Sequence, residues 1–105
     1  MIVHGEPLVS VVTPVYNGAA YLKECIESVL AQTYSNWEYI IVNNCSTDAT
    51  LQIAEEYARR DRRIHVHDNS TFVGVMENHN IGLSLISTHS KYSKIVCADD
   101  FIFQD

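Results

Sequence analysis

The sequence predicts an α/β fold, a Rossmann-like three-layer α/β/α arrangement around a mostly parallel sheet. Short β-branched apolar runs alternate along the chain with segments of helical periodicity, in the order β-α-β-α-β-α-β. Such alternation is typical of parallel sheets with helices on both faces and right-handed crossovers. The length of 105 residues suits one domain. We therefore expect residues 1–105 to form a single domain.

The first half of the chain contains two strand–helix units. Residues 8–13 (LVSVVT) form a nearly continuous apolar run, which indicates a buried parallel strand. Pro14 is expected to end that strand. Apolar residues then recur along one stripe of a helix over 21–30. A second strand is predicted at 37–42 and a second helix at 51–58.

The second half repeats the alternation with shorter and weaker signals. A short strand is predicted at 64–67, and a weaker helix, interrupted by Gly82, at 76–86. The fourth strand, 92–98, runs straight into Asp99-Asp100. The four strands and three helices complete the predicted layers.

The charge of the chain argues against nucleic acid as a partner. The net charge is −6, which disfavours nucleic acid. The only concentration of basic residues lies near the end of the second helix, where the helix dipole favours cations. It consists of Arg59, Arg60, Arg62 and Arg63, diluted by neighbouring acids. We interpret this cluster as a solvated helix end.

Cysteine usage indicates a reducing compartment. The three cysteines, Cys25, Cys45 and Cys97, are odd in number and contain no C-x-x-C pair, so neither a disulfide framework nor a zinc site is predicted. This segment has no signal-peptide pattern and no apolar run long enough for a membrane span. A cytoplasmic location is expected, with the cytoplasmic face of the membrane as the alternative.

Polar clusters fall where three of the predicted strands end. They comprise residues 14–17 after the first strand, 43–48 after the second and 99–100 after the fourth. Ligands of open parallel sheets bind outside the carboxyl ends of the strands. We therefore expect these clusters to converge on one ligand site.

The sequence lacks the usual phosphate-binding loops. Neither G-x-G-x-x-G nor G-x-x-x-x-G-K-[ST] is present, which disfavours a dinucleotide enzyme or a P-loop NTPase. In an acidic chain, a diphosphate is better held through a metal ion. Asp99 and Asp100 are the candidate ligands, because Mg²⁺ and Mn²⁺ prefer carboxylate oxygens. The alternative for this pair is a solvated turn.

Two of the clusters contain groups suited to a nucleobase. Tyr16 is placed to stack on a base, or to pack over the first helix. The amides of Asn43 and Asn44 are suited to the edge of a base, or to turn and capping chemistry. Composition and spacing leave both pairs of alternatives open.

These clusters occur in an order that resembles the opening of family 2 glycosyltransferases of the GT-A fold. The resemblance is most specific over residues 9–50 and covers nearly the whole chain. The matching segments are Pro14-x-Tyr16-Asn17, the helix end Ser28 to Tyr34, Ser46 to Asp48, Asn80-Ile81-Gly82 as an Asn-x-Gly helix start, and Cys97 to Asp100 as a D-x-D-type metal motif.

The resemblance implies a glycosyltransferase that moves a sugar from a nucleotide-diphosphate donor, often UDP-linked, to an acceptor hydroxyl with inversion. The acceptor would be a saccharide or a lipid-linked saccharide, and Mn²⁺ or Mg²⁺ would bridge the diphosphate. Carried over by position, the metal ligands are Asp100 and Asp99. The implied donor-binding residues are Pro14, Val15, Tyr16, Asn17, Asn44, Ser46, His79 and Asp99. Among these, Tyr16 would stack on the base and Asn44 would face its edge.

This sequence also departs from the family pattern. Asn43-Asn44-Cys45 stands where the family usually has Asp-Asp-Gly, and Cys97 replaces the first acid of the metal motif. Asn44 can still accept a hydrogen bond through its carbonyl oxygen, but it is neutral and can also donate. The uridine preference that the family implies is therefore weakened in this chain.

The resemblance places the catalytic base beyond residue 105, so no catalytic residue is assigned within the chain. We expect a donor-binding part of a longer glycosyltransferase domain, inactive alone and truncated before the acceptor half. A sheet without its remaining strands would leave an edge open to pair with a second copy. The alternatives are a non-catalytic nucleotide-binding domain and, less favoured, a nucleotidyltransferase.

Overall fold

The computed structural model describes residues 7–31 and 35–96. Its elements alternate in the predicted order β-α-β-α-β-α-β. Their bounds are β1 (Leu8–Val15), α1 (Ala19–Leu30), β2 (Trp37–Asn43), α2 (Thr50–Arg60), β3 (Ile64–Asp68), α3 (Val75–Ser84) and β4 (Ser90–Ile95).

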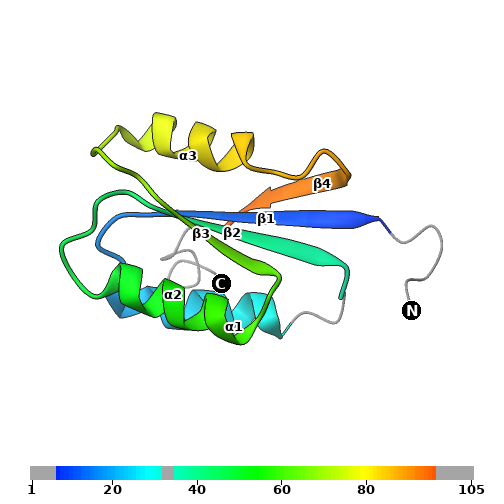
Figure 1. Cartoon of the computed structure of the whole chain (residues 1–105), viewed down its shortest axis with the longest axis horizontal. Helices are drawn as coiled ribbons and strands as arrows, with labels where there is room; N and C mark the ends of the chain where they lie inside the picture. The colour runs from blue at the N-terminus through cyan, green and yellow to red at the C-terminus, as the bar shows by residue number, and fades with distance from the viewer. Residues whose placement is uncertain (1–6, 32–34, 97–105) are drawn as a thin grey trace, which may run out of the picture.

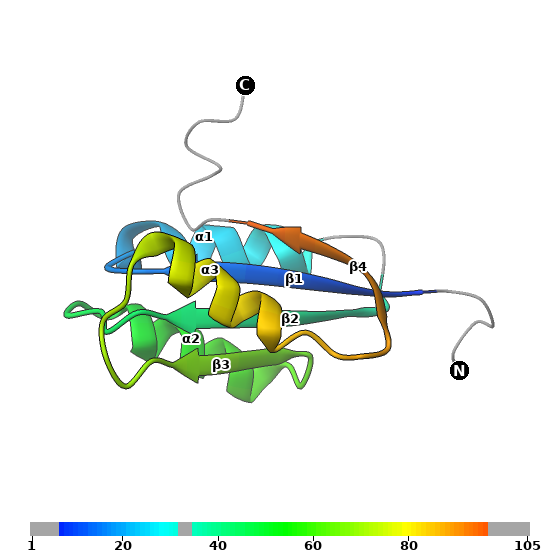
Figure 2. The same ribbon diagram turned by 90° about the horizontal axis from the view of Figure 1, so that it is seen from above.

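The described strands form one parallel sheet in the order β3-β2-β1-β4. Helices α1 and α2 cover one face of this sheet and α3 covers the other, so the molecule has three layers (Figure 1). Viewed from above, α3 lies across the middle of the sheet, while the loops that leave β1, β2 and β3 lie together at its left edge (Figure 2). The predicted α/β/α architecture with a parallel sheet is confirmed.

The two faces of the sheet bury apolar side chains unequally. Successive residues of a strand point to opposite faces, so Val11 and Val15 of β1 face α1 and α2, whereas Val12 faces α3. The larger core includes Leu22 and Ile26 of α1, both fully buried. Burying each such side chain contributes about 1.5–3 kcal/mol. The apolar core between α3 and the sheet is much smaller. The packing of α3 therefore depends on a short distance between its backbone and the strands.

A hydroxyl pair lies inside the larger core. The hydroxyl groups of Thr13 and Tyr39 are 2.7 Å apart, and both side chains are fully buried. The thiol of Cys25 lies 3.5 Å from the Tyr39 hydroxyl. Burial raises the pKa of Tyr39 well above its usual value, because the charged phenolate loses its hydration. This group therefore stays neutral and serves packing.

Pro14 does not end β1, as the sequence indicated, but lies inside it. In a parallel strand, the backbone groups of successive residues point alternately to the two neighbouring strands. The carbonyl oxygen of Val12 accepts from Val96 on the β4 side, so the nitrogen of Pro14 faces that side too. The described pairing of β1 with β4 ends at Val12. Pro14 thus continues the strand without removing a hydrogen bond from the described part of this ladder.

The Asn80-Ile81-Gly82 motif was expected at a helix start, and this expectation is wrong. All three residues lie in the second half of α3, which begins at Val75. Gly82 is buried where α3 crosses the sheet, and a Cβ atom there would lie 2.4 Å from Cγ1 of Val12 and 3.1 Å from Cγ2 of Val42. The glycine allows close packing and does not mark a helix boundary.

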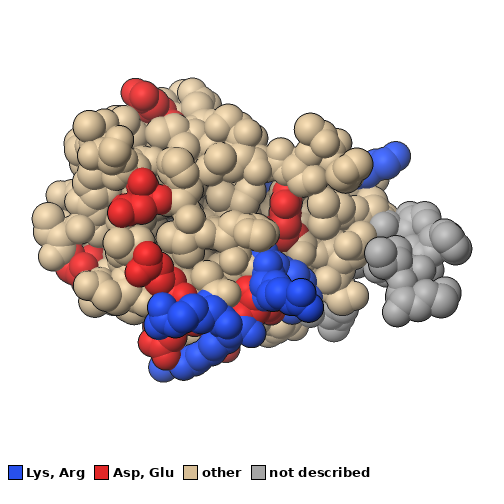
Figure 3. Space-filling model, viewed as in Figure 1, with Lys and Arg blue, Asp and Glu red and all other residues tan. Residues whose placement is uncertain are grey.

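The arginine cluster at the end of α2 is only in part a solvated helix end. Figure 3 shows most of the basic side chains of this face gathered along the lower side of the molecule. Arg59 and Arg60 are exposed on the last turn of α2. Arg63 instead stacks on Trp37, with its guanidinium carbon 3.6 Å from the ring centroid. This part of the cluster packs at the start of β3.

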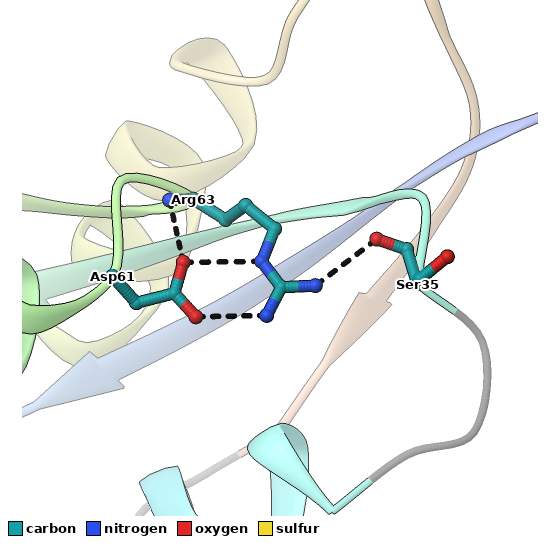
Figure 4. A network of polar contacts seen from close by, with 3 residues as sticks. All are labelled: Ser35, Asp61 and Arg63. Atoms are coloured by element: carbon teal, nitrogen blue, oxygen red, sulfur yellow. Dashed lines mark hydrogen bonds and ion pairs between the residues drawn. The ribbon is translucent and has the colours of Figure 1, made fainter. Parts of the chain in front are cut away.

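Arg63 also joins two chain segments by hydrogen bonds (Figure 4). It donates to both carboxylate oxygens of Asp61, at 2.8 and 3.1 Å, and to the carbonyl oxygen of Ser35 at 3.1 Å. The hydrogen bonds from Arg63 to the Asp61 carboxylate hold the pKa of Asp61 below its ordinary value. The network ties the α2–β3 turn to the start of β2, at the opposite end of this strand from its carboxyl end.

Candidate functional site

The loops after β1, β2 and β3 meet at the carboxyl edge of the sheet. The backbone N–H of Asn44 donates to Val15 at 2.9 Å, and that of Asn69 donates to Asn43 at 2.9 Å. The structure therefore brings the first two polar clusters together, as the sequence predicted, and adds the loop after β3. The third cluster, Asp99-Asp100, lies outside the described residues.

Side chains from the first two clusters hold their loops together. The backbone N–H of Asn17 donates to the Ser46 hydroxyl at 2.9 Å, and the backbone N–H of Thr47 donates to Oδ1 of Asn17 at 2.7 Å. Asn17 has a φ of 49°, a left-handed conformation that asparagine tolerates better than most residues. Asn17 and Ser46 thus make structural contacts, and their donor-binding roles stay predictions.

Asp48 extends this contact to the start of α1. Its Oδ2 accepts from the backbone N–H of Ala19 at 3.2 Å, and its Oδ1 accepts from the backbone N–H and the hydroxyl of Thr50. The Thr50 hydroxyl in turn accepts from the N–H of Gly18 at 2.9 Å. Asp48 of the loop after β2 and Thr50, the first residue of α2, therefore satisfy backbone donors at the start of α1, which has no side-chain cap of its own.

The hydrogen bonds to Asp48 predict a pH-dependent stability. Partial desolvation acts to raise the pKa of Asp48, but the hydrogen bonds from Thr50 and Ala19 outweigh it and hold the pKa below its ordinary value. A carboxylate with a lowered folded-state pKa stabilises the fold above its unfolded-state pKa of about 3.9, and this contribution disappears as pH falls through the folded value. Asp48→Asn should therefore lower the melting temperature at pH 7, and the difference from wild type should shrink below about pH 4.

Thermal unfolding of both proteins between pH 7 and pH 3 tests this expectation. Glu55→Gln is the matched control, because Glu55 is exposed on α2 and takes no part in the loop contacts described above. A difference between Asp48→Asn and wild type that stays constant down to pH 3 would contradict the assigned role of the Asp48 carboxylate.

Tyr16 is the exposed aromatic residue that the sequence placed at this edge. Its side chain is 51% exposed directly after β1. The ring of Phe72, from the loop after β3, lies against it with centroids 5.0 Å apart and planes at 72°. Phe72 is itself 62% exposed. The alternative in which Tyr16 packs inward over α1 is not what the structure shows.

Asn44 is buried, and its side-chain amide is bound within the protein. Its Nδ2 donates to the carbonyl oxygen of Val73 at 2.8 Å, and its Oδ1 accepts from the N–H of Val73 at 3.0 Å. The side chain of Asn69 donates to the same oxygen at 3.3 Å. The role predicted for Asn44 at the edge of a base would require the pairing with Val73 to open.

Two further asparagines were missed by sequence reasoning. Asn69 and Asn78 are buried, and Nδ2 of Asn69 donates to Oδ1 of Asn78 at 2.8 Å. Nδ2 of Asn43 donates to Asp68 at 2.8 Å. The available signal was positional, since Asn69 directly follows β3 just as Asn44 follows β2. This network fixes the path of the loop between β3 and α3.

Cys45 occupies a position where the backbone favours glycine. Its φ is 57°, which costs a residue with a side chain about 1–2 kcal/mol. This explains why the related pattern Asp-Asp-Gly carries glycine here. The thiol of Cys45 donates to the carbonyl oxygen of Asn69 at 3.3 Å, which couples the second loop to the third.

Three further predicted residues, Pro14, Val15 and His79, fall within the described part of the chain. Pro14 and Val15 are buried at the end of β1. His79 is half-buried on α3, and its Nδ1 is 2.9 Å from the carbonyl oxygen of Val75. The predicted metal ligands, Asp99 and Asp100, cannot be placed because they lie outside the described residues. Within 7–31 and 35–96, no group of three or more His, Cys, Asp or Glu side chains is arranged to hold a metal ion.

Comparison with known proteins agrees with this architecture. The family model "Glycosyl transferase family 2" matches residues 10–102. An uncharacterized glycosyltransferase from Haemophilus influenzae is 43% identical over 94 residues, which are 90% of this chain and 28% of that protein. The chain therefore spans little more than a quarter of this relative.

Two solved structures have a similar fold. The crystal structure of TarS 1-349 from S. aureus superposes with a TM-score of 0.78 and 31% identity, over 87% of this chain and 27% of that one. TarS has also been solved in complex with UDP and with UDP-GlcNAc. The mannosyltransferase PcManGT from Pyrobaculum calidifontis, in complex with GDP-Man and Mn²⁺, has a TM-score of 0.80 at 23% identity, over 91% of this chain and 28% of that one.

The parallel sheet and its loop edge thus have the GT-A glycosyltransferase fold. The chain belongs to glycosyl transferase family 2. No helix within the described residues is long and apolar enough to cross a membrane.

Proposed function

We propose that the protein carrying this chain transfers a sugar from a nucleotide-diphosphate donor, with a UDP-sugar as the first candidate, to an acceptor hydroxyl with inversion. The chain supplies the donor and metal side of that reaction. The observation that carries the proposal is the exposed ring of Tyr16, fixed at the carboxyl edge of a parallel sheet by the contacts of Asn17 with the next loop. The complexes of the related TarS with UDP and UDP-GlcNAc support it.

In this proposal, the donor lies across the loops at the carboxyl edge. Tyr16 stacks on the base, the end of β1 at Pro14 and Val15 lines the pocket, and His79 and Asp99 lie toward the phosphates and the ribose. Asn17 and Ser46 shape the pocket wall through their mutual contacts. Asn44 lies directly after β2, where its amide pairs with Val73.

A metal ion suits this edge because the loops offer no fixed positive charge. Residues 16–19, 44–49 and 69–74 contain neither Lys nor Arg, and Asp48 adds a negative charge. A diphosphate would be repelled there without a cation. We propose that Asp100 and Asp99 hold Mn²⁺ or Mg²⁺, which would stabilise the negative charge that develops on the leaving diphosphate.

The wider context is proposed with the same function. Residues 1–105 form one domain segment of a longer glycosyltransferase, which acts in the cytoplasm or at the cytoplasmic face of the membrane. Its acceptor is a saccharide or a lipid-linked saccharide, and its catalytic base lies outside this segment. Pairing of two copies at an edge of the sheet, where β3 and β4 are outermost among the described strands, stays a prediction for the isolated segment.

A nucleotide panel tests the proposed site. The melting temperature of the full protein carrying this chain is measured with UDP, GDP, CDP, TDP and ADP, each with and without Mn²⁺. A ligand present at 100 times its Kd should stabilise the protein by about 2.7 kcal/mol. We expect a metal-dependent shift with at least one nucleotide, UDP first, and loss of the metal dependence in Asp100→Ala.

Two comparisons make this result decisive. Glu55→Ala removes an acid from the exposed face of α2 and should keep the shift. If none of the five nucleotides shifts the melting temperature, the donor-site proposal is wrong. Nucleotide binding without sugar transfer or donor hydrolysis would favour a non-catalytic nucleotide-binding domain, whose only sequence support is the loss of acids at Asn43, Asn44 and Cys97.

A further inference from the structure

The loop after β3 contacts the predicted base-binding residues through two neighbouring positions. Phe72 lies against the ring of Tyr16. The backbone of the next residue, Val73, forms hydrogen bonds with both the nitrogen and the oxygen of the Asn44 side-chain amide. The sequence assigned Tyr16 and Asn44 to the base without including this loop. The structure thus adds a third segment to the donor edge.

Phe72 is held at the surface by an anchored loop. On its N-terminal side, the backbone of Asn69 donates to Asn43, and its side chain binds Asn44 and Asn78. On its C-terminal side, Gly74 accepts from the N–H of Asn78 as α3 begins. The asparagines of these anchors are buried, yet the ring of Phe72 is 62% exposed. The ring therefore adds little to the core, and its position needs another explanation.

The geometry of the aromatic pair suits a planar ligand. Two rings in edge-to-face contact at 72° form a corner, so a flat ring that stacks on one of them also contacts the other. Centroids 5.0 Å apart leave no room for a base between the rings, so the base lies beside the pair. Val75 and Met76, the first residues of α3, are also exposed, at 74% and 77%.

The amide of Asn44 suits Val73 better than a carboxylate would. Its two atoms match the N–H and the carbonyl oxygen of Val73, one accepting and one donating. An aspartate at this position could accept from the N–H, but it would face the carbonyl oxygen without a proton to donate. This accounts for Asn44 at a position where the family usually has Asp.

We propose that Phe72 forms, together with Tyr16, an aromatic site for the base of the donor, and that Asn44 positions Phe72 through Val73 and does not read the base. This inference rests on the proposed function. Stacking accepts any base, so Phe72 contributes affinity but little selectivity. A residue that read the base edge would instead change the preference among bases.

Affinity measurements on the full protein test the role of Phe72. Calorimetry with Mn²⁺ gives Kd values for UDP, CDP, GDP and pyrophosphate, which has no base. Phe72→Ala should weaken all nucleotides roughly 2- to 10-fold and leave pyrophosphate unchanged. Phe72→Tyr should retain wild-type affinity. Tyr92→Ala is the matched control, because Tyr92 is 63% exposed on β4 and pairs with Val9 near the amino end of β1.

The role of Asn44 has its own measurements. Asn44→Asp should weaken UDP and CDP by the same factor, because it loosens the loop and removes no contact with the base. In the Phe72→Ala background, the same change should cost little further affinity, since a positioning residue has nothing left to position. A changed ratio of the UDP and CDP affinities in Asn44→Asp would show that Asn44 reads the base and would overturn this half of the proposal.

The outcomes separate this inference from the proposed function. If wild type binds none of the nucleotides, the proposed function fails. If wild type binds UDP and Phe72→Ala binds it equally well, the donor site stands and the role of Phe72 is refuted. Because Phe72 is exposed, its loss should leave the fold intact, and matching melting temperatures of the unliganded proteins check this.

Discussion

Gly82→Val is expected to destabilise the fold by about 3 kcal/mol or more, near the upper end of the usual cost of overpacking a core. The Cβ atom alone would lie 2.4 Å from Cγ1 of Val12 and 3.1 Å from Cγ2 of Val42. Both neighbours are β-branched side chains of central strands with few alternative rotamers, so neither can turn aside. α3 would have to move away from the sheet. Chemical denaturation of the variant and of wild type measures the loss.

Two further variants sharpen this test. Gly74→Ala changes a glycine with no atom within 4 Å of an added Cβ, so it should cost no more than about 1 kcal/mol as a change of helix cap. Val12→Ala removes the nearest obstacle and should make Gly82→Ala less costly than it is in wild type. Wild-type stability in Gly82→Val would mean that α3 does not pack this closely on β1.

The sequence predicted the layers because its strongest patterns are local. β1 and β2 are apolar runs buried on both faces of the sheet, and α1 has a continuous apolar stripe. These periodicities depend only on neighbouring residues. A mostly parallel sheet was expected from the alternation of strands and helices, and every described strand pair is parallel.

Errors arose where one residue depends on a contact distant in sequence. Pro14 is normally a strand breaker, but it is tolerated in β1 because its nitrogen points to the β4 side, beyond the described pairing. The periodicity correctly placed Gly82 inside a helix, but the family resemblance placed it at a helix start. Its packing role depends on Val12, which is 70 positions away in the chain. Neither relation is visible in a local pattern.

The candidate site, like the fold, could be predicted only in part from the sequence. The rule for parallel sheets predicted that the loops containing Tyr16 and Asn44 meet, and they do. The sequence did not reveal that Asn44 pairs with Val73, or that Phe72 reaches Tyr16. Both contacts depend on the path of the loop after β3, which buried asparagines fix and no periodic pattern describes.

The second large expected effect concerns Tyr16 itself. If the base of the donor stacks on this ring, Tyr16→Ala should weaken UDP binding by the energy of one base–aromatic stack, about 1–3 kcal/mol. That corresponds to a roughly 5- to 150-fold increase in Kd, measured by calorimetry in the presence of Mn²⁺. Tyr16→Phe keeps the ring and should bind UDP nearly as tightly as wild type. Pyrophosphate affinity should not change in either variant.

A double-mutant comparison tests whether Tyr16 and Phe72 contact the same base. Tyr16 and Phe72 contact each other, so their substitutions should not be independent. If both rings contact the same base, Tyr16→Ala should cost less affinity in a Phe72→Ala protein, where the base is already held less firmly. Full additivity of the two losses would mean that each ring acts separately. An unchanged UDP affinity in Tyr16→Ala would show that the base does not bind against this ring.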